Sequence, residues 1–105
     1  MTDLALARRL LQLRRDGLRV CLATVVEAAG STPRDVGAKM LLCGDGATFG
    51  TIGGGCGEAV VRSAALRMLA SGQGPGLVAV DLTQGPGERD GDVCGGRMRI
   101  FVDPG

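Results

Sequence analysis

The stretch Val20-Cys21-Leu22-Ala23-Thr24-Val25-Val26 is the longest apolar run of the chain and is interrupted only by a threonine. It is far too short to cross a bilayer, and an apolar run of this length is typical of a strand that is covered on both faces. We therefore expect a strand over residues 18–28. Because each covered face needs a layer packed against it, this strand predicts a sheet with helices on it.

Two helices and four further strands are expected around this strand. Residues 3–16 place their leucines on one arc of a helix and their arginines on the opposite arc, and Gly17 follows as a stop. A second helix is expected over residues 58–71, with Gly72 as its cap. The further strands are expected over residues 38–43, 47–52, 76–82 and 97–103. The order α-β-β-β-α-β-β predicts an α/β (α+β) fold, a single domain with two main helices and a mixed β-sheet whose strand order cannot be read from the sequence.

Length and composition exclude several classes of protein. A chain of 105 residues with 45% apolar residues is expected to form one domain with a modest core. Its formal charge of +1 and its two aromatic residues give no drive toward nucleic acid. Residues 1–15 carry arginines in place of an apolar run, which argues against a signal peptide. We expect a soluble cytoplasmic protein with no membrane segment and no nucleic-acid partner.

The run Gly53-Gly54-Gly55-Cys56-Gly57 lies between an expected strand and an expected helix. The N–H groups at a helix start are unpaired and carry the positive end of the helix dipole, so glycines there can cradle a phosphate. A helix start also favours the thiolate form of a cysteine, which makes Cys56 a candidate nucleophile or ligand. The alternative is a tight turn with a small buried cysteine.

A loop bracketed by glycine and proline follows the first strand. Arg34 and Lys39, the only lysine of the chain, are candidate phosphate ligands. Ser31 and Thr32 add hydroxyl groups to the same loop. The alternative is a solvated loop in which Arg34 forms a weak surface ion pair.

A third candidate segment, Cys94-Gly95-Gly96, precedes the last expected strand, and its glycines allow the backbone to approach a ligand closely. The alternative is a turn cysteine. Cys21 and Cys43 fall inside strand-like apolar runs and are expected in the core. The four cysteines lack the paired spacing of a zinc site, and the chain has no histidine to serve as a general base.

Taken together, four ordered motifs resemble the N-terminal domain of the XdhC/CoxI family. The motifs are Gly30-Ser31-Thr32-Pro33-Arg34, Gly37-Ala38-Lys39-Met40, Gly50-Thr51-Ile52-Gly53-Gly54-Gly55-Cys56 and Cys94-Gly95-Gly96. The resemblance covers essentially all of residues 1–105. There are two departures. Gly57 stands where a larger apolar residue usually follows the cysteine, and the chain stops before the C-terminal Rossmann-like domain of typical members. We therefore expect either a stand-alone domain or a truncated chain.

The resemblance implies an accessory protein rather than an enzyme. Family members bind the molybdenum cofactor, a pterin dithiolene that carries a phosphate, as cargo. They pass it to molybdoenzymes of the xanthine dehydrogenase or CO dehydrogenase type, with a cysteine desulfurase as a further partner. Cys56 is then a candidate contact to molybdenum. The implied cofactor-binding residues are Ser31, Thr32, Arg34, Lys39, Gly53, Gly54, Gly55, Cys56, Cys94, Gly95 and Gly96.

Two other functions stay open on the residues alone. One is a thiol-dependent transferase that acts through Cys56, and the other is a non-catalytic interaction domain. We also expect a homo-oligomer, because the last strand is a candidate sheet edge and a small domain without its usual neighbour exposes apolar surface.

Overall fold

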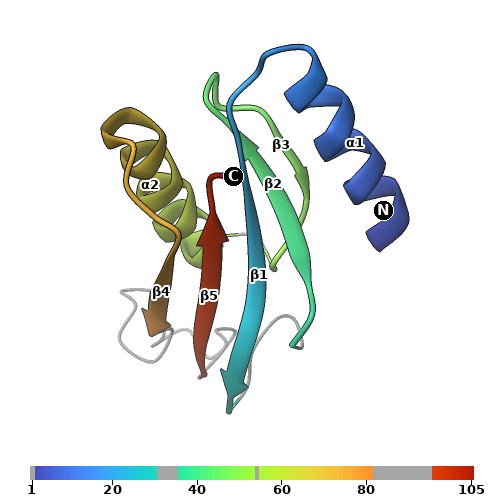
Figure 1. Ribbon diagram of the computed structural model, residues 1–105. Helices are drawn as coiled ribbons and strands as arrows, with labels where there is room; N and C mark the ends of the chain where they lie inside the picture. The colour runs from blue at the N-terminus through green and yellow to red at the C-terminus, as the bar shows by residue number, and fades with distance from the viewer. Residues whose placement is uncertain (1, 31–35, 54, 82–95) are drawn as a thin grey trace.

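A computed structural model describes residues 2–30, 36–53, 55–81 and 96–105, with the backbone alone at residues 55 and 56. Two helices and five strands follow one another in the predicted order (Figure 1): α1 (Asp3–Arg15), β1 (Val20–Ala29), β2 (Lys39–Cys43), β3 (Thr48–Gly50), α2 (Gly55–Ser71), β4 (Gly76–Asp81) and β5 (Arg97–Asp103). The predicted α+β fold class is confirmed. Helix α2 begins earlier than expected, so Cys56 lies within its first turn. Among the described residues, neither helix has the length and apolarity needed to cross a membrane.

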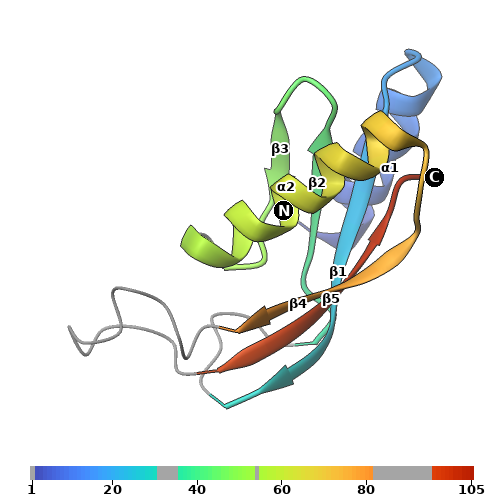
Figure 2. The same cartoon turned by 90° about the vertical axis from the view of Figure 1, so that its left-hand side faces the viewer.

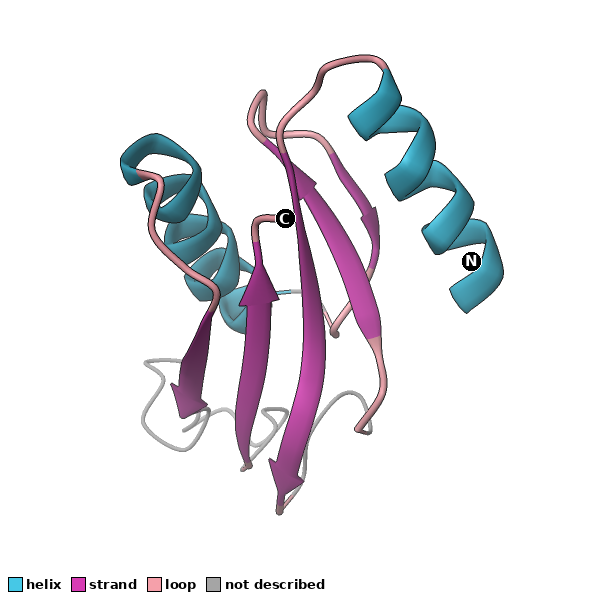
Figure 3. Cartoon of the chain, in the orientation of Figure 1, coloured by secondary structure: helices cyan, strands magenta, loops and turns pink. Residues whose placement is uncertain are grey.

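The five strands form one sheet in the order β3-β2-β1-β5-β4 (Figure 3). All four pairs are antiparallel, so the described strands contain no parallel pair of the kind that a mixed sheet requires. A helical connection such as α2 usually joins parallel neighbouring strands. Here it joins β3 and β4, which are the two edge strands and not neighbours, so it creates no parallel pair. The expectation that the last strand is an edge is wrong, since β5 lies between β1 and β4.

The first half of β1 is buried on both faces, as its apolar run predicts. Val20 packs in a cluster with residues of α1, whereas Cys21 and Ala23 belong to the cluster that contains α2. Figure 2 shows α1 and α2 on opposite sides of the sheet. From Val26 onward the strand is exposed, so only half of the predicted strand is covered on both faces. The α1-side cluster is Leu6, Val20, Leu41 and Cys43, and the α2-side cluster is Cys21, Ala23, Val25, Met40, Leu42, Ile52, Val61, Ala65, Leu69, Val80, Met98, Ile100 and Val102.

Local hydrogen bonds explain where the elements begin and end. The Thr2 hydroxyl caps α1 by accepting from the Ala5 N–H at 3.1 Å. Gly17 ends the helix with a φ of 82°, a conformation that favours glycine. Between β2 and β3, the Asp45 carboxylate accepts from the Ala47 N–H at 2.9 Å and holds the turn. The sequence predicted the glycine stop, and the turn lies in the gap between the strands expected over residues 38–43 and 47–52.

Helix α1 covers only the β3-β2-β1 half of its side of the sheet. On the β5 and β4 half, Phe101 and Leu77 are register partners and keep 36% and 59% of their surface exposed among the described residues. Thr24 continues this row onto β1. One half of the sheet therefore has core residues on both sides. In the other half, the described residues leave the α1 side of the sheet uncovered, and we call this side the open face.

The close approach of β3 to β2 and α1 requires glycine at position 50. A methyl group on Gly50 would lie 2.8 Å from the Lys39 carbonyl oxygen and 3.3 Å from both methyl groups of Leu6, and the φ of Gly50 is +78°. Gly46 has a φ of +95° but no atom within 4 Å of such a methyl group. A methyl group at Gly46 would therefore cause backbone strain alone, whereas a methyl group at Gly50 would cause both backbone strain and a steric clash.

We predict that Gly50→Ala lowers the free energy of unfolding by more than Gly46→Ala. Strain at a positive φ costs about 1–2 kcal/mol at either position, and displacement of Leu6 and the β2 backbone adds about 1–3 kcal/mol at Gly50. Urea unfolding of the two variants measures the difference. Equal losses would contradict the tight packing of β3 between β2 and α1.

Candidate functional site

Residues next to three of the predicted site segments lie at one end of the sheet. At this end β1 and β4 finish and β5 begins. Ala29 and Asp81 are both register partners of Arg97, and Gly96 is buried directly before it. The first turn of α2 reaches the same end, because a methyl group on Gly57 would lie 3.5 Å from Met98 Cε. The structure therefore brings the chain before position 31, the chain after position 95 and the start of α2 together.

The turn before α2 is tied by the side chain of Thr51. Its Oγ1 accepts from the Gly53 N–H at 2.9 Å and donates to the Glu58 carboxylate in the first turns of α2. The hydroxyl thus connects the exit of β3 to the helix. One N–H group of the predicted phosphate cradle is occupied by this hydrogen bond. A carboxylate also stands at the helix start, where it already interacts favourably with the helix dipole.

Several predicted site residues can be placed and others cannot. Gly53 is exposed and has a φ of 125°, a conformation open mainly to glycine. Gly55 and Cys56 contribute the first backbone positions of α2. Gly57, the departure from the family pattern, has room for a methyl group at ordinary contact distance, since Val80 Cγ1 would lie 3.8 Å away. The predicted residues that lie outside the described part of the chain are Ser31, Thr32, Arg34, Gly54, Cys94 and Gly95.

Lys39 lies on the opposite side of the sheet from α2. Its Nζ donates to Asp3 Oδ2 of α1 at 3.1 Å and to the Gly37 carbonyl oxygen at 2.9 Å. The next residue, Met40, packs in the α2-side cluster, as alternation along β2 requires. The structure thus does not bring the Lys39 ammonium group together with the turn that carries Cys56.

The two cysteines expected in the core are confirmed there. Cys21 and Cys43 are buried and free. Burial, followed by the negative charge of Asp103, raises the pKa of Cys21, and its Sγ donates to the Ala65 carbonyl oxygen at 3.8 Å. Burial, followed by Asp45, raises the pKa of Cys43. In the described part of the chain, no cluster of three or more His, Cys, Asp or Glu side chains could hold a metal ion.

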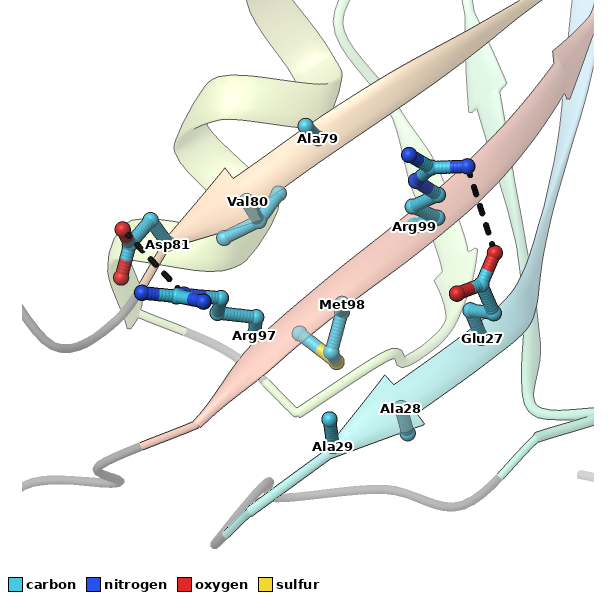
Figure 4. A pocket seen from close by; sticks show the side chains of 9 residues that line it. All are labelled: Glu27, Ala28, Ala29, Ala79, Val80, Asp81, Arg97, Met98 and Arg99. Atoms are coloured by element: carbon cyan, nitrogen blue, oxygen red, sulfur yellow. Dashed lines mark hydrogen bonds and ion pairs between the residues drawn. The ribbon is translucent and has the colours of Figure 1, made fainter.

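A hollow of about 410 Å³ opens at the same end of the sheet (Figure 4). Two ion pairs border it: Arg99 Nη1 lies 3.4 Å from Glu27 Oε2, and Arg97 Nε lies 3.6 Å from Asp81 Oδ2. Sequence reasoning did not select these charged residues, because they lie on three separate strands and only the pairing register brings them together. The remaining lining residues are Ala28, Ala29, Ala79, Val80 and Met98.

This combination of fold and glycine-flanked sheet end is that of a known class of proteins. The sequence profile of the XdhC and CoxI family matches residues 13–81, from the end of α1 to the end of β4. The matched segment contains β1, Lys39 and the turn that carries Cys56. The chain belongs to the XdhC and CoxI family.

Relatives and a solved structure agree with this membership. The uncharacterized protein YqeB of Escherichia coli is 34% identical over 91 residues, which are 87% of this chain and 16% of that protein. The molybdenum cofactor insertion chaperone PaoD of Escherichia coli is 40% identical over 57 residues, 54% of this chain and 18% of that protein. A crystal structure of a xanthine dehydrogenase from Bacillus halodurans matches with a TM-score of 0.73 and 29% identity, over 92% of this chain and 29% of that chain. The chain thus spans less than a third of the length of these proteins.

We predict that Thr51→Val lowers the free energy of unfolding by about 1–2 kcal/mol, because the Gly53 N–H and the Glu58 carboxylate both lose the Thr51 hydroxyl. Thr51→Ser, which keeps the hydroxyl, is the matched control and should cost less. Chemical denaturation of the two variants measures the difference. A valine variant as stable as the serine variant would show that the hydroxyl does not hold the turn.

We predict that the folded protein loses stability as the pH rises above the ordinary thiol value of 9.0, because folding raises the pKa of both Cys21 and Cys43. A raised pKa contributes stability that is present below the unfolded pKa and is lost above it. The double variant Cys21→Ala/Cys43→Ala should lose less stability between about pH 8 and about pH 10. Identical pH slopes for the two proteins would contradict the burial of these thiols.

Proposed function

We propose that this chain binds the molybdenum cofactor as cargo and delivers it to a client molybdoenzyme of the xanthine dehydrogenase type. The observation that carries the proposal is the 40% identity with the insertion chaperone PaoD over 57 residues, within a family match that covers residues 13–81. The role is that of an accessory maturation factor rather than an enzyme, and the cytoplasm is its proposed location. A cysteine desulfurase and a second copy of this chain are proposed as further partners.

The proposed cofactor site is the end of the sheet next to the start of α2. The described residues there fit such a ligand in two respects: Gly53 is exposed in the turn before α2, and a hollow at the same end of the sheet, on the face away from α2, has arginines on its border. Cys56 is the proposed contact to molybdenum. The first N–H groups of α2, which a helix leaves without backbone partners, are proposed to face an anionic part of the ligand.

The other proposed cofactor-binding residues follow the family motifs. Lys39 is the least suited of these to direct contact, because its ammonium group is bonded on the α1 side of the sheet. The cofactor would supply the molybdenum centre and its dithiolene for the client's chemistry. This chain would supply only binding, shielding from water and release. The remaining proposed residues are Ser31, Thr32, Arg34, Gly53, Gly54, Gly55, Cys94, Gly95 and Gly96.

We predict that the purified chain binds isolated molybdenum cofactor and that Cys56→Ala binds it at least about tenfold more weakly, a loss of about 1.4 kcal/mol. Cys43→Ala is the matched control, because Cys43 is buried in the α1-side cluster. The measurement is a titration under anaerobic conditions, read from the cofactor absorbance and from pterin fluorescence after oxidation.

Three results would contradict the proposal in different ways. No binding by the unmodified chain would reject the cargo function and leave an interaction domain. Turnover of a thiol acceptor that depends on Cys56 would indicate a transferase. Equal loss in the Cys43→Ala and Cys56→Ala variants would remove Cys56 from the site.

A further inference from the structure

We propose that the hollow bordered by Glu27, Arg99, Arg97 and Asp81 recognises a planar heterocycle with a 2-amino-4-oxo pyrimidine edge, which is the edge of a pterin or a guanine. The inference rests on the proposed function, because the molybdenum cofactor carries a pterin. It assigns the recognition of the pterin ring to these four residues, which lie outside every motif of the family resemblance.

The open face of the sheet arranges these residues as two rows across three strands. In one row the register places Arg99 between Glu27 of β1 and Ala79 of β4. In the next row it places Arg97 between Ala29 of β1 and Asp81 of β4. Each arginine thus has a carboxylate on one side and an alanine on the other, in alternating order. The two alanines are short and lie on the two outer strands, so each arginine of β5 has one side that is not filled by a long side chain (Figure 4).

A β-bulge in β1 is what brings Glu27 to this face. The register shifts between Val25, which pairs with Ile100, and Glu27, which pairs with Arg99. In a strand without the extra residue, position 27 would instead pair with Met98, whose side chain belongs to the α2-side cluster. Bulges of this kind are enriched near functional sites, where they redirect a side chain. Here the bulge keeps a carboxylate out of the core and sets it beside Arg99.

The edge of a pterin or guanine ring matches a carboxylate with an adjacent arginine. The ring N–H and the 2-amino group are two donors side by side, and a carboxylate can accept both. The neighbouring 4-oxo group is an acceptor, which a guanidinium can donate to. The ring face can lie over Ala29, which shares the face of β1 with Glu27, with its register partner Arg97 stacked on the ring, because guanidinium groups stack on planar rings. A volume of about 410 Å³ is within the range of small-ligand sites.

The Glu27–Arg99 pair is free to exchange partners with such a ligand. Among the described residues, Arg99 Nη1 is the partner of Glu27 Oε2, and the side chains of Arg99 and Glu27 are 58% and 68% exposed. An ion pair with this exposure contributes little to folding. Replacing either residue should therefore test recognition without unfolding the protein.

The experiment compares two ligands that differ at one position of the ring. The probes are 6-hydroxymethylpterin and the corresponding 6-hydroxymethyl-lumazine, in which a 2-oxo group replaces the 2-amino group. The lumazine sets a carbonyl oxygen against the carboxylate, so the unmodified chain should bind the pterin at least tenfold more tightly. Glu27→Gln and Arg99→Gln should each reduce this discrimination to less than threefold. The matched control is Asp3→Asn, because Asp3 is an exposed, ion-paired carboxylate on α1.

Guanosine monophosphate forms the second arm and distinguishes the two sources of the edge. If the pterin binds more tightly than the nucleotide, the hollow recognises the pterin itself. If the nucleotide binds more tightly, the hollow recognises a guanine in a dinucleotide form of the cofactor. Equal affinity for pterin and lumazine, no binding of either at millimolar concentration, or unchanged discrimination in folded Glu27→Gln would overturn the inference. If any of these results accompanied tight binding of the whole cofactor, the proposed function would stand without this site. If the chain discriminated between pterin and lumazine but did not bind the whole cofactor, the proposed function would be rejected and the ring-recognition site would stand.

Discussion

The structure depends on the burial of both faces of β1 over its first half. Val20 on one face needs α1, and Cys21 and Ala23 on the other face need α2, so the two helices must lie on opposite sides of the sheet. Burial of a medium-sized apolar side chain contributes about 1.5–3 kcal/mol, and this strand contributes several such residues to both clusters. The remaining strands extend the sheet from this centre in both directions.

The two halves of β1 have different roles. The first half is buried and stabilises the fold, and the second half is exposed and available for binding. Beyond Val25 neither helix covers β1, and the bulge turns Glu27 toward the open face. The charged rows on β1, β5 and β4 lie at the end of the sheet that is adjacent in sequence to the glycine-containing motifs. The start of α2 packs against Met98 and Val80 at this end, so the α2-side core holds the first turn of α2 in place beside the candidate site.

Sequence periodicity predicted every helix and strand that the structure describes, because the apolar alternation and the glycine stops are local signals. Strand order depends on contacts between distant residues, which explains why the antiparallel sheet and the interior position of β5 were not foreseen. Of the candidate site, the turn before Cys56 could be located, since a glycine run between a strand and a helix is readable. The hydrogen bonds of Thr51 and the ionic rows of the hollow could not, because Glu27 reaches Arg99 only through a bulge and a register that no local pattern records. The side on which Lys39 lies depends equally on the packing of α1.

The central claim is that one end of the sheet is the cofactor site, and chemical-shift mapping of the ¹⁵N-labelled chain during titration with molybdenum cofactor tests it most directly. The account predicts the largest changes at the amides of Ala29, Gly96 and Arg97 and in the first turn of α2. The amides of α1 should shift little, because that helix packs over the other half of the sheet. Changes confined to α1 and the β2–β3 turn, with the sheet end unaffected, would contradict the account.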